Sequence, residues 1–202
     1  ALVAVFDRNP ERAAQAATTF RVPLGTDNRE VFFDQRLDAV AVCTPPFTHC
    51  ELTLEALGHG CHVLTEKPMA MSAQEAGAMQ AAAQEKGRLL CVSHNFLFSR
   101  AVRRAEGARK KAGPVQYVMG LQLSSHRRRL PEWHEQLPGG LLFDELPHLL
   151  YLLQYYLGRL RLTGVRVAAR SASGHPSLTE IQVLGERGPG RVEDRRRPVR
   201  ER

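Results

Sequence analysis

The feature that most constrains the fold of this chain is a regular alternation of strand and helix patterns in its first 95 residues. Strand patterns occupy 2–6, 37–44, 62–66 and 89–95, and 22–26 is predicted to be a second short strand or a turn. Helical patterns separate these segments. Strands that alternate with helices form a parallel sheet connected by crossover helices. The sequence therefore predicts an α/β fold whose first part is a doubly wound parallel sheet.

The predicted helices begin at residues whose side chains cap a helix N-terminus. Asn9 stands directly before a proline, which suits the first helical position. Thr48 and Glu51 form one capping-box pattern, and Ser72 and Glu75 form another. In such a box the hydroxyl and the carboxylate each accept a hydrogen bond from the backbone N–H of the other residue. These patterns predict where three of the crossover helices start.

The second part of the chain has a different pattern. Its predicted elements are a basic helix, an alternating strand, a loop and an apolar helix, over 99–111, 115–125, 126–140 and 144–158. Two more strand patterns follow. Strands grouped after a helix predict an α+β domain with a mostly antiparallel open sheet. We therefore expect a first domain over 1–97 and a second, incomplete domain over 98–186.

Part of the net charge of +7 is concentrated at the C-terminal end. From Arg187 onward the chain has seven arginines, three acidic residues and almost no large apolar side chains. A segment of this composition cannot fold alone, so we expect a disordered basic tail over 187–202. Such a tail gives at most salt-sensitive, non-specific binding, so no specific nucleic-acid partner is expected. The sequence has no apolar run of about 18 residues, so it predicts no membrane span.

The cysteine spacing argues against a metal site. Cys43, Cys50, Cys61 and Cys91 include no C-x-x-C pair, whereas structural zinc sites favour closely spaced cysteines. No metal is therefore expected. Cys43, Cys61 and Cys91 lie in or beside predicted strands, which predicts buried, reduced thiols. Reduced thiols fit a reducing cytosol, so we expect a cytoplasmic protein.

Asp7 lies at the carboxyl end of the first predicted strand, where a carboxylate can accept hydrogen bonds from ribose hydroxyls. An acid stabilised by a helix dipole explains the same residue equally well. Arg8 beside it can neutralise a 2′-phosphate, so NAD and NADP are both candidates. The turn G-x-G-x-x-G, which brings backbone close to a pyrophosphate, is absent from the 202 residues. We expect the first strand and this turn to precede Ala1.

The triplet Glu66-Lys67-Pro68 ends a predicted strand, at the edge of the sheet where open α/β folds bind ligands. A partly desolvated lysine at such an edge can exchange a proton near neutral pH. A surface lysine paired with a neighbouring glutamate is the simpler explanation when the triplet is taken alone. The triplet alone therefore does not assign a catalytic lysine.

Asp144 and His148 are four residues apart, so they share one face of a predicted helix. The carboxylate can orient the imidazole, and histidine is the usual side chain for proton transfer at neutral pH. The alternative is a polar start to an apolar core helix. Because Pro147 is tolerated only in a first helical turn, we expect both residues at the exposed end of the helix.

Two segments together resemble the glucose–fructose oxidoreductase and inositol dehydrogenase family, Gfo/Idh/MocA. The first is LDAVAVCTPPFTHCELTLEALGHGCHVLTEKPMAMS over 37–72, in which a strand, T-P-P, a histidine, a helix and E-K-P follow in order. The second is GGLLFDELPHLLYLLQYYLG over 139–158. The resemblance covers roughly 1–185. It implies a truncated Rossmann-type doubly wound parallel sheet, followed by an α+β domain with a mostly antiparallel open sheet.

The resemblance also implies an NAD(P)-dependent oxidoreductase that transfers hydride between nicotinamide and a sugar, a polyol or a related alcohol or carbonyl compound. Lys67 matches the family's catalytic lysine. Asp144 and His148 match its D-x-x-x-H pair, in which histidine takes the hydroxyl proton while lysine polarises or protonates the same oxygen. The residues expected at the cofactor are Asp7, Arg8, Thr44, Pro45, His49, Glu66 and Lys67. Because the family's open sheet often forms dimers, the expected partners are a small-molecule substrate and a second copy of the chain.

The chain departs from the family pattern at several places. Leu146 stands where a glycine is often found, and the phosphate-binding turn is missing. These departures leave an alternative open, namely a non-catalytic relative or an inactive fragment that acts as a binding or regulatory module. His126, Arg127 and Trp133 lie in the loop where family members meet substrate, although such loop residues are equally consistent with plain surface.

Overall fold

A computed structural model describes residues 1–124, 132–170 and 174–196. The chain divides into two compact units, Ala1–Cys91 and Val92 onward. The division therefore falls after Cys91 rather than after residue 97.

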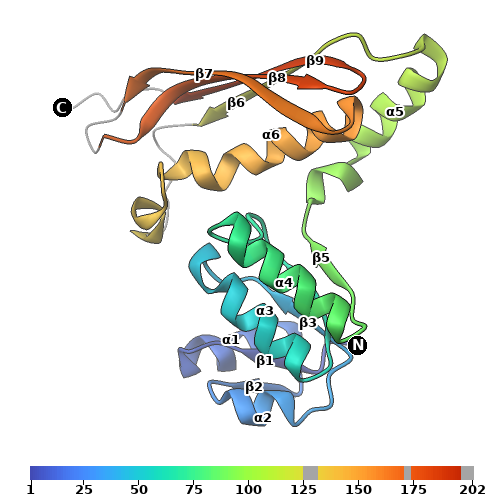
Figure 1. Ribbon diagram of the computed structural model, residues 1–202. Helices are drawn as coiled ribbons and strands as arrows, with labels where there is room; N and C mark the ends of the chain where they lie inside the picture. Colours follow the sequence, from blue (N-terminus) through green and yellow to red (C-terminus); the bar gives the residue numbers. More distant parts are fainter. Residues whose placement is uncertain (125–131, 171–173, 197–202) are drawn as a thin grey trace. The chain divides into compact units, whose positions relative to one another are not determined.

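The first unit has the expected alternation of strands and helices (Figure 1). Its strands are β1 (Ala4–Phe6), β2 (Leu24–Thr26), β3 (Ala39–Val42), β4 (His62–Thr65) and β5 (Leu90–Val92). Its helices are α1 (Pro10–Phe20), α2 (Arg29–Phe33), the 3₁₀ turn η1 (Pro46–Thr48), α3 (His49–Gly58) and α4 (Ala73–Glu85). The predicted α/β class is confirmed.

The sheet of the first unit is in two pieces in the described residues. β1 pairs with β2 in parallel, and β3 pairs with β4 in parallel, with β5 beside β4. A cavity of about 510 Å³ is lined by residues of both β1 and β3. The expectation that a strand and a glycine-rich turn precede Ala1 is not tested by these residues and stays a prediction.

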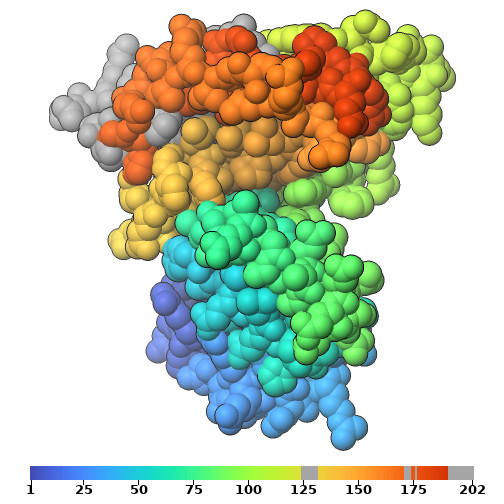
Figure 2. Space-filling model, in the orientation of Figure 1, coloured from blue at the N-terminus to red at the C-terminus, as the bar shows by residue number. Residues whose placement is uncertain are grey.

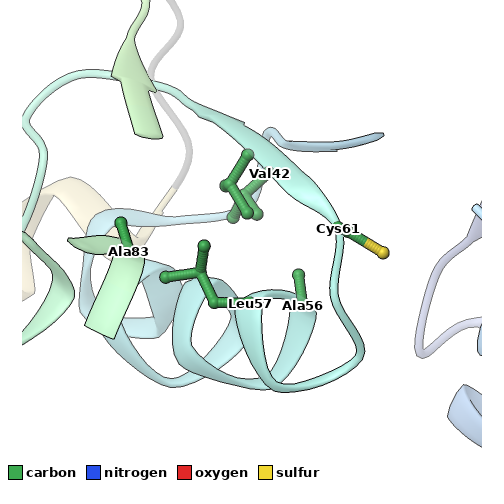
Figure 3. Packing of buried hydrophobic residues seen from close by; sticks show 6 residues of the cluster. Val42, Ala56, Leu57, Cys61 and Ala83 are labelled. Atoms are coloured by element: carbon green, nitrogen blue, oxygen red, sulfur yellow. The ribbon is translucent and has the colours of Figure 1, made fainter. Parts of the chain in front are cut away.

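The core of the first unit lies between the sheet and helices α3 and α4. In Figure 3, Ala56 and Leu57 point from α3 toward Val42 of β3. Leu57 and Ala56 are fully buried, and Val63 of β4 is 3% exposed. The continuous apolar runs of β3 and β4 are thus explained by burial against these helices. This packing fixes the strand ends that carry the candidate site.

The two predicted capping boxes have different outcomes. Ser72 Oγ accepts the backbone N–H of Glu75, at 3.1 Å, as the pattern predicted. The Glu75 carboxylate, however, accepts the N–H of Met71 rather than that of Ser72. The box at Thr48 is wrong: its side chain makes no cap bond, because its backbone is helical and its hydroxyl faces Pro45 instead.

The second unit consists of helices and one sheet. Its helices are η2 (Asn95–Phe98), α5 (Arg100–Ala112), η3 (Glu132–Gln136) and α6 (Leu141–Leu157). Its strands are β6 (Val118–Ser124), β7 (Leu160–Arg170), β8 (Pro176–Gly185) and β9 (Gly188–Arg196). The strand order is β6-β9-β8-β7, with β6 and β9 parallel and the other pairs antiparallel. α6 lies along one face, where Leu149, Leu153 and Leu157 pack on Ile181 and Val183 (Figure 1).

The expected disordered tail over 187–202 is wrong for the residues that the structure describes. Gly188–Arg196 form β9, which follows β8 through a tight hairpin in which Gly185 pairs with Gly188. Because β9 lies between β6 and β8, its backbone is paired on both sides and does not depend on apolar side chains. A Cβ at Gly190 would come within 2.7 Å of Leu157, so this glycine lets α6 pack closely. Residues 197–202 lie outside the described residues.

The expected exposed start of the apolar helix is also wrong. α6 begins at Leu141, directly after Gly140 with its positive φ of 60°, so Pro147 lies in the second turn. Asp144 and His148 are only 6% and 7% exposed. Leu141 is buried as well, and burial of this added turn offsets the cost of a proline inside the helix, about 3 kcal/mol.

The cysteines are less buried than expected. Cys61 is buried, whereas Cys43 and Cys91 are exposed, because β3 and β5 each leave one face uncovered. In the ranges that the structure describes, no cluster of histidine, cysteine, aspartate or glutamate is arranged to hold a metal ion. No helix within those same ranges is long and apolar enough to cross a membrane.

Candidate functional site

Asp7 follows β1 and is held in a fixed orientation. Its Oδ1 accepts the backbone N–H of Asn9 at 2.8 Å. The Asn9 side chain in turn accepts the N–H groups of Glu11 and Arg12 at the start of α1. An ionised carboxylate keeps lone pairs for further donors. Asp7 can therefore bind hydroxyl groups, while Arg8 beside it is exposed.

The segment after β3, residues 44–48, is stabilised by hydrogen bonds of its own threonine side chains. The Thr48 hydroxyl lies 2.6 Å from Thr44 Oγ1 and 2.8 Å from the Pro45 carbonyl oxygen. Thr44 is exposed and Pro45 is half-buried. The predicted cofactor residues Thr44 and Pro45 thus form a compact turn at the carboxyl end of β3, with a hydroxyl at the surface.

His49 is fully buried at the start of α3. Its Nδ1 lies 2.8 Å from the Pro68 carbonyl oxygen, and its Nε2 lies 2.8 Å from the Thr44 carbonyl oxygen. Both ring nitrogens are therefore engaged by backbone. A direct contact of His49 with a cofactor stays a prediction. The geometry instead makes His49 a link that holds the end of β3 against the segment after β4.

Lys67 lies in that second segment, directly after β4. Its backbone N–H is donated to Glu66 Oε2 at 3.1 Å, and both side chains are half-buried. The peptide bond between Lys67 and Pro68 is cis, and Pro68 is buried. Because His49 bonds to Pro68, the backbone beside Lys67 is fixed relative to Thr44. The structure thus places the predicted residues of β3 and β4 at one sheet edge.

His148 lies within a polar cluster of the second unit. Its Nδ1 is 2.8 Å from the Tyr151 hydroxyl, and its ring stacks on Phe96 with centroids 4.3 Å apart. Tyr151 also receives the backbone N–H of Phe96 at 3.2 Å and lies 3.4 Å from Asn95 Oδ1. The histidine ring is therefore fixed both by stacking and by a hydrogen bond.

Asp144, on the same helix, has a second histidine as a partner. Its Oδ2 lies 3.2 Å from Nε2 of His134, and the two side chains are 9% and 8% exposed. Trp133 stacks on His134 at 3.9 Å. The orientation of His148 by Asp144, which the four-residue spacing predicted, stays a prediction. His126 and Arg127 lie outside the described residues.

Sequence reasoning missed Tyr151 and His134. Tyr151 is three residues after His148, so helical spacing could have identified it as a neighbour on the same face. His134 reaches Asp144 from a separate segment, η3, and no spacing rule in the sequence links the two.

The strand ends of the first unit fit one part of a dinucleotide. Asp7 offers a carboxylate and Thr44 offers an exposed hydroxyl, which suit ribose hydroxyls. A glycine-rich turn for the pyrophosphate is absent from the 202 residues. These features define a protein of the nucleotide-binding α/β class, with a second α+β unit that carries a buried histidine cluster.

Comparison with known proteins refines this class. Residues 1–94 match the model of an oxidoreductase family with an NAD-binding Rossmann fold, Gfo/Idh/MocA. Through these residues the chain belongs to that family. It is 30% identical to 2,7-anhydro-N-acetylneuraminate hydratase of Mediterraneibacter gnavus, over 83% of this chain and 46% of the relative. It is 32% identical to 1,5-anhydro-D-fructose reductase of Ensifer adhaerens, over 91% of this chain and 57% of the relative.

A solved structure shares the fold. Levoglucosan dehydrogenase in complex with NADH and levoglucosan superposes with a TM-score of 0.83 and 23% identity, over 96% of this chain and 57% of that chain. This likeness confirms the expected Rossmann-type sheet followed by an α+β unit, whose sheet is mixed because β6 and β9 are parallel. The chain spans about half the length of the curated relatives named above.

Proposed function

We propose that this chain is part of an NAD(P)-dependent oxidoreductase that transfers hydride between nicotinamide and a sugar, a polyol or a related alcohol or carbonyl compound. The observation that carries the proposal is the fixed sheet edge at which His49 joins the Thr44 turn to the Glu66-Lys67-Pro68 segment. Open α/β sheets bind their ligands at this edge. One relative, the 1,5-anhydro-D-fructose reductase of Ensifer adhaerens, supports the reaction class by its name.

Two residues of the chain are proposed to transfer the hydroxyl proton of the substrate. When an alcohol is oxidised, its C–H bond breaks as a hydride leaves, and its O–H proton must pass to a base. We assign this proton transfer to Lys67 and His148, which are half-buried and buried respectively. Bound nicotinamide would supply the hydride acceptor. Asp7 would bind ribose hydroxyls of the dinucleotide, and Thr44 would lie beside the nicotinamide ribose.

Titration with NADH and NADPH tests the proposal. We expect a saturable change in nicotinamide fluorescence with at least one of them. Asp7→Ala should weaken the affinity about tenfold, because a hydrogen bond to a charged group contributes roughly 1.5–3 kcal/mol.

Asp27→Ala is the matched control for this titration, since Asp27 is an exposed acid directly after β2 with no assigned role. Its affinity should stay within about twofold of the unsubstituted chain. Absence of binding to both nucleotides would contradict the proposed activity of this chain. It would favour the alternative, a non-catalytic module. The observation that favours that second function is the cavity between β1 and β3, two strands that do not pair in the described residues.

We further infer that the second unit associates with a second copy of the chain through the outer face of its sheet. Gly120 faces α6, since a Cβ there would meet Leu149 at 3.2 Å. Met119, Leu121 and Leu123 therefore point to the opposite face, and they are 60%, 47% and 66% exposed. An apolar stripe on an uncovered sheet face is typical of an interaction surface. Strands β7 and β8 of this sheet contribute to the orange-to-red surface in Figure 2.

Light scattering coupled to size-exclusion chromatography tests this association. Leu123→Lys should shift a dimer toward the monomer, because it places a charge in an apolar contact. Leu89→Lys is the control, since Leu89 is 72% exposed in the first unit. A monomer at all concentrations of the unsubstituted chain would contradict the inference.

A further inference from the structure

Helix α5 concentrates positive charge at the surface of the second unit (Figure 1). Over Arg100–Ala112 it has six basic residues and one acid, hence a net charge of +5 in a chain whose total is +7. None of its side chains is buried. The sequence predicted a basic helix here, and the structure shows in addition that most of its residues are exposed.

Five of the six basic residues share one side of α5. At 3.6 residues per turn they fall within about 120° of the helix circumference. These five residues, all exposed, form the basic stripe: Arg100, Arg103, Arg104, Lys110 and Lys111. Gly107 is on the same side, so no other side chain interrupts the stripe. The sixth, Arg109, lies on the other side and donates two hydrogen bonds to Glu106, the one acid of α5.

Stability of the helix explains only part of the basic stripe. Lys110 and Lys111 lie in the last turn, where the helix dipole favours cations. Arg100 and Arg103 lie near the first turn, where the dipole favours acids, and α5 has no acid there. Arg100 and Arg104 are four residues apart, so their like charges repel. A bound anion would remove both the unfavourable dipole interaction and this repulsion.

We propose that the basic stripe binds the phosphate backbone of nucleic acid without reading its sequence. The stripe extends over eleven residue steps, about 17 Å along the helix axis. One DNA strand has a phosphate about every 3.4 Å along its axis, so a strand beside α5 presents about five phosphates to the five cations. Lysine and arginine are usual partners of these phosphates. This binding goes beyond the proposed oxidoreductase activity and does not depend on it.

An anionic membrane surface also attracts cations, but α5 lacks the second feature of a helix that lies in a membrane. Such a helix inserts an apolar face opposite its charged face. On α5 the side away from the basic stripe holds Val102, Glu106 and Arg109, which are half-buried and include two charged groups. The flanks of the stripe are formed by alanines. The observations therefore favour nucleic acid over a membrane.

Fluorescence anisotropy with a labelled DNA duplex of about 20 random base pairs tests the proposal on the full chain. The affinity is measured between about 50 and 200 mM salt, because each phosphate contact adds about 0.9 to the slope of log affinity against log salt. Arg103→Gln with Arg104→Gln removes two charges and keeps good helix formers. We expect a slope smaller by about 1.8 and an affinity roughly 10- to 60-fold weaker near 0.1 M salt.

Arg12→Gln with Lys86→Gln is the matched control, since it removes two charges from exposed positions of the first unit. Its slope should change by less than about 0.5. The arginines from Arg187 onward are present in both double variants, so any binding by them cancels in the comparison. Far-UV circular dichroism should give both variants the helix content of the unsubstituted chain.

Three results would overturn the proposal. The first is equal loss of affinity in the two double variants, which would show an effect of net charge alone. The second is no binding of the duplex at about 50 mM salt. The third is sedimentation with vesicles of phosphatidylcholine and phosphatidylserine that requires Arg103 and Arg104, without binding of the duplex, which would assign the basic stripe to a membrane surface.

Discussion

Lys67→Met lowers kcat for hydride transfer by about 10²- to 10⁴-fold, with cofactor affinity changed little, if the proposed function holds. A positioned general acid or base contributes this much to a rate. Methionine keeps the unbranched stem but cannot hold a proton. The backbone contacts that position residue 67, through Glu66 and the buried Pro68, do not use the lysine side chain. Steady-state kinetics with a panel of sugars and polyols measures the loss.

Lys86→Met is the matched control for this substitution. Lys86 lies at the end of α4, half exposed beside Glu85, and has no assigned role. It should retain nearly full activity. If Lys67→Met retained activity within about twofold, Lys67 would not take part in proton transfer.

Leu57→Ala destabilises the first unit by about 2–5 kcal/mol, a large share of the stability of an ordinary domain. Leu57 is fully buried and packs with Val42, Val63 and Ala83 (Figure 3). Removing its side-chain carbons leaves a cavity that the surrounding helices and strands fill only in part. Thermal unfolding followed by far-UV circular dichroism measures the change.

Leu54→Ala is the control on the same helix, since Leu54 is 36% exposed and should lose less than about 1 kcal/mol. The single tryptophan, Trp133, lies in the second unit, so its fluorescence reports on that unit separately. We expect the circular dichroism transition to shift while the fluorescence transition stays. Equal losses in Leu57→Ala and Leu54→Ala would contradict the assigned core.

The order of elements in the first unit could be predicted because each signal is local. Runs such as 37–44 and 62–66 are apolar because they are buried strands, and Asn9 and Ser72 cap the helices as expected. Thr48 has the same residue type as a cap, but its hydroxyl is held by the turn before it. A sequence pattern cannot distinguish a threonine hydroxyl that caps a helix from one that bonds to the preceding turn.

The second unit was less predictable from the sequence. The two predictions that were wrong, the disordered tail and the exposed start of the apolar helix, depend on contacts between residues distant in sequence. The arginine-rich segment from Gly188 forms a strand only because β6 and β8 lie on either side of it. Pro147 is tolerated inside α6 only because the added turn at Leu141 is buried. Neither amino-acid composition nor helix and strand propensity predicts the strands that pair with β9 or the burial of the first turn of α6.

The residues of the candidate site could be proposed from the sequence, but their contacts could not. The triplet that contains Lys67 and the pair of Asp144 and His148 could be identified from motifs. The engagement of both His49 ring nitrogens and the contact of Tyr151 with His148 required coordinates. Hydrogen-bond direction depends on where each lone pair points, which residue spacing does not specify.

The placement of β9 has a consequence for how the protein is made. Val118 of β6 pairs with Gly190 of β9, so the sheet of the second unit joins residues synthesised at very different times. The strand pairs of the first unit connect residues closer in sequence, such as Ala4 with Leu24. On the ribosome, the strand pairs of the first unit can therefore form early, whereas the edges of β6 and β8 that face β9 stay unpaired until β9 emerges. A chaperone that protects exposed strand edges should bind the nascent chain in that interval.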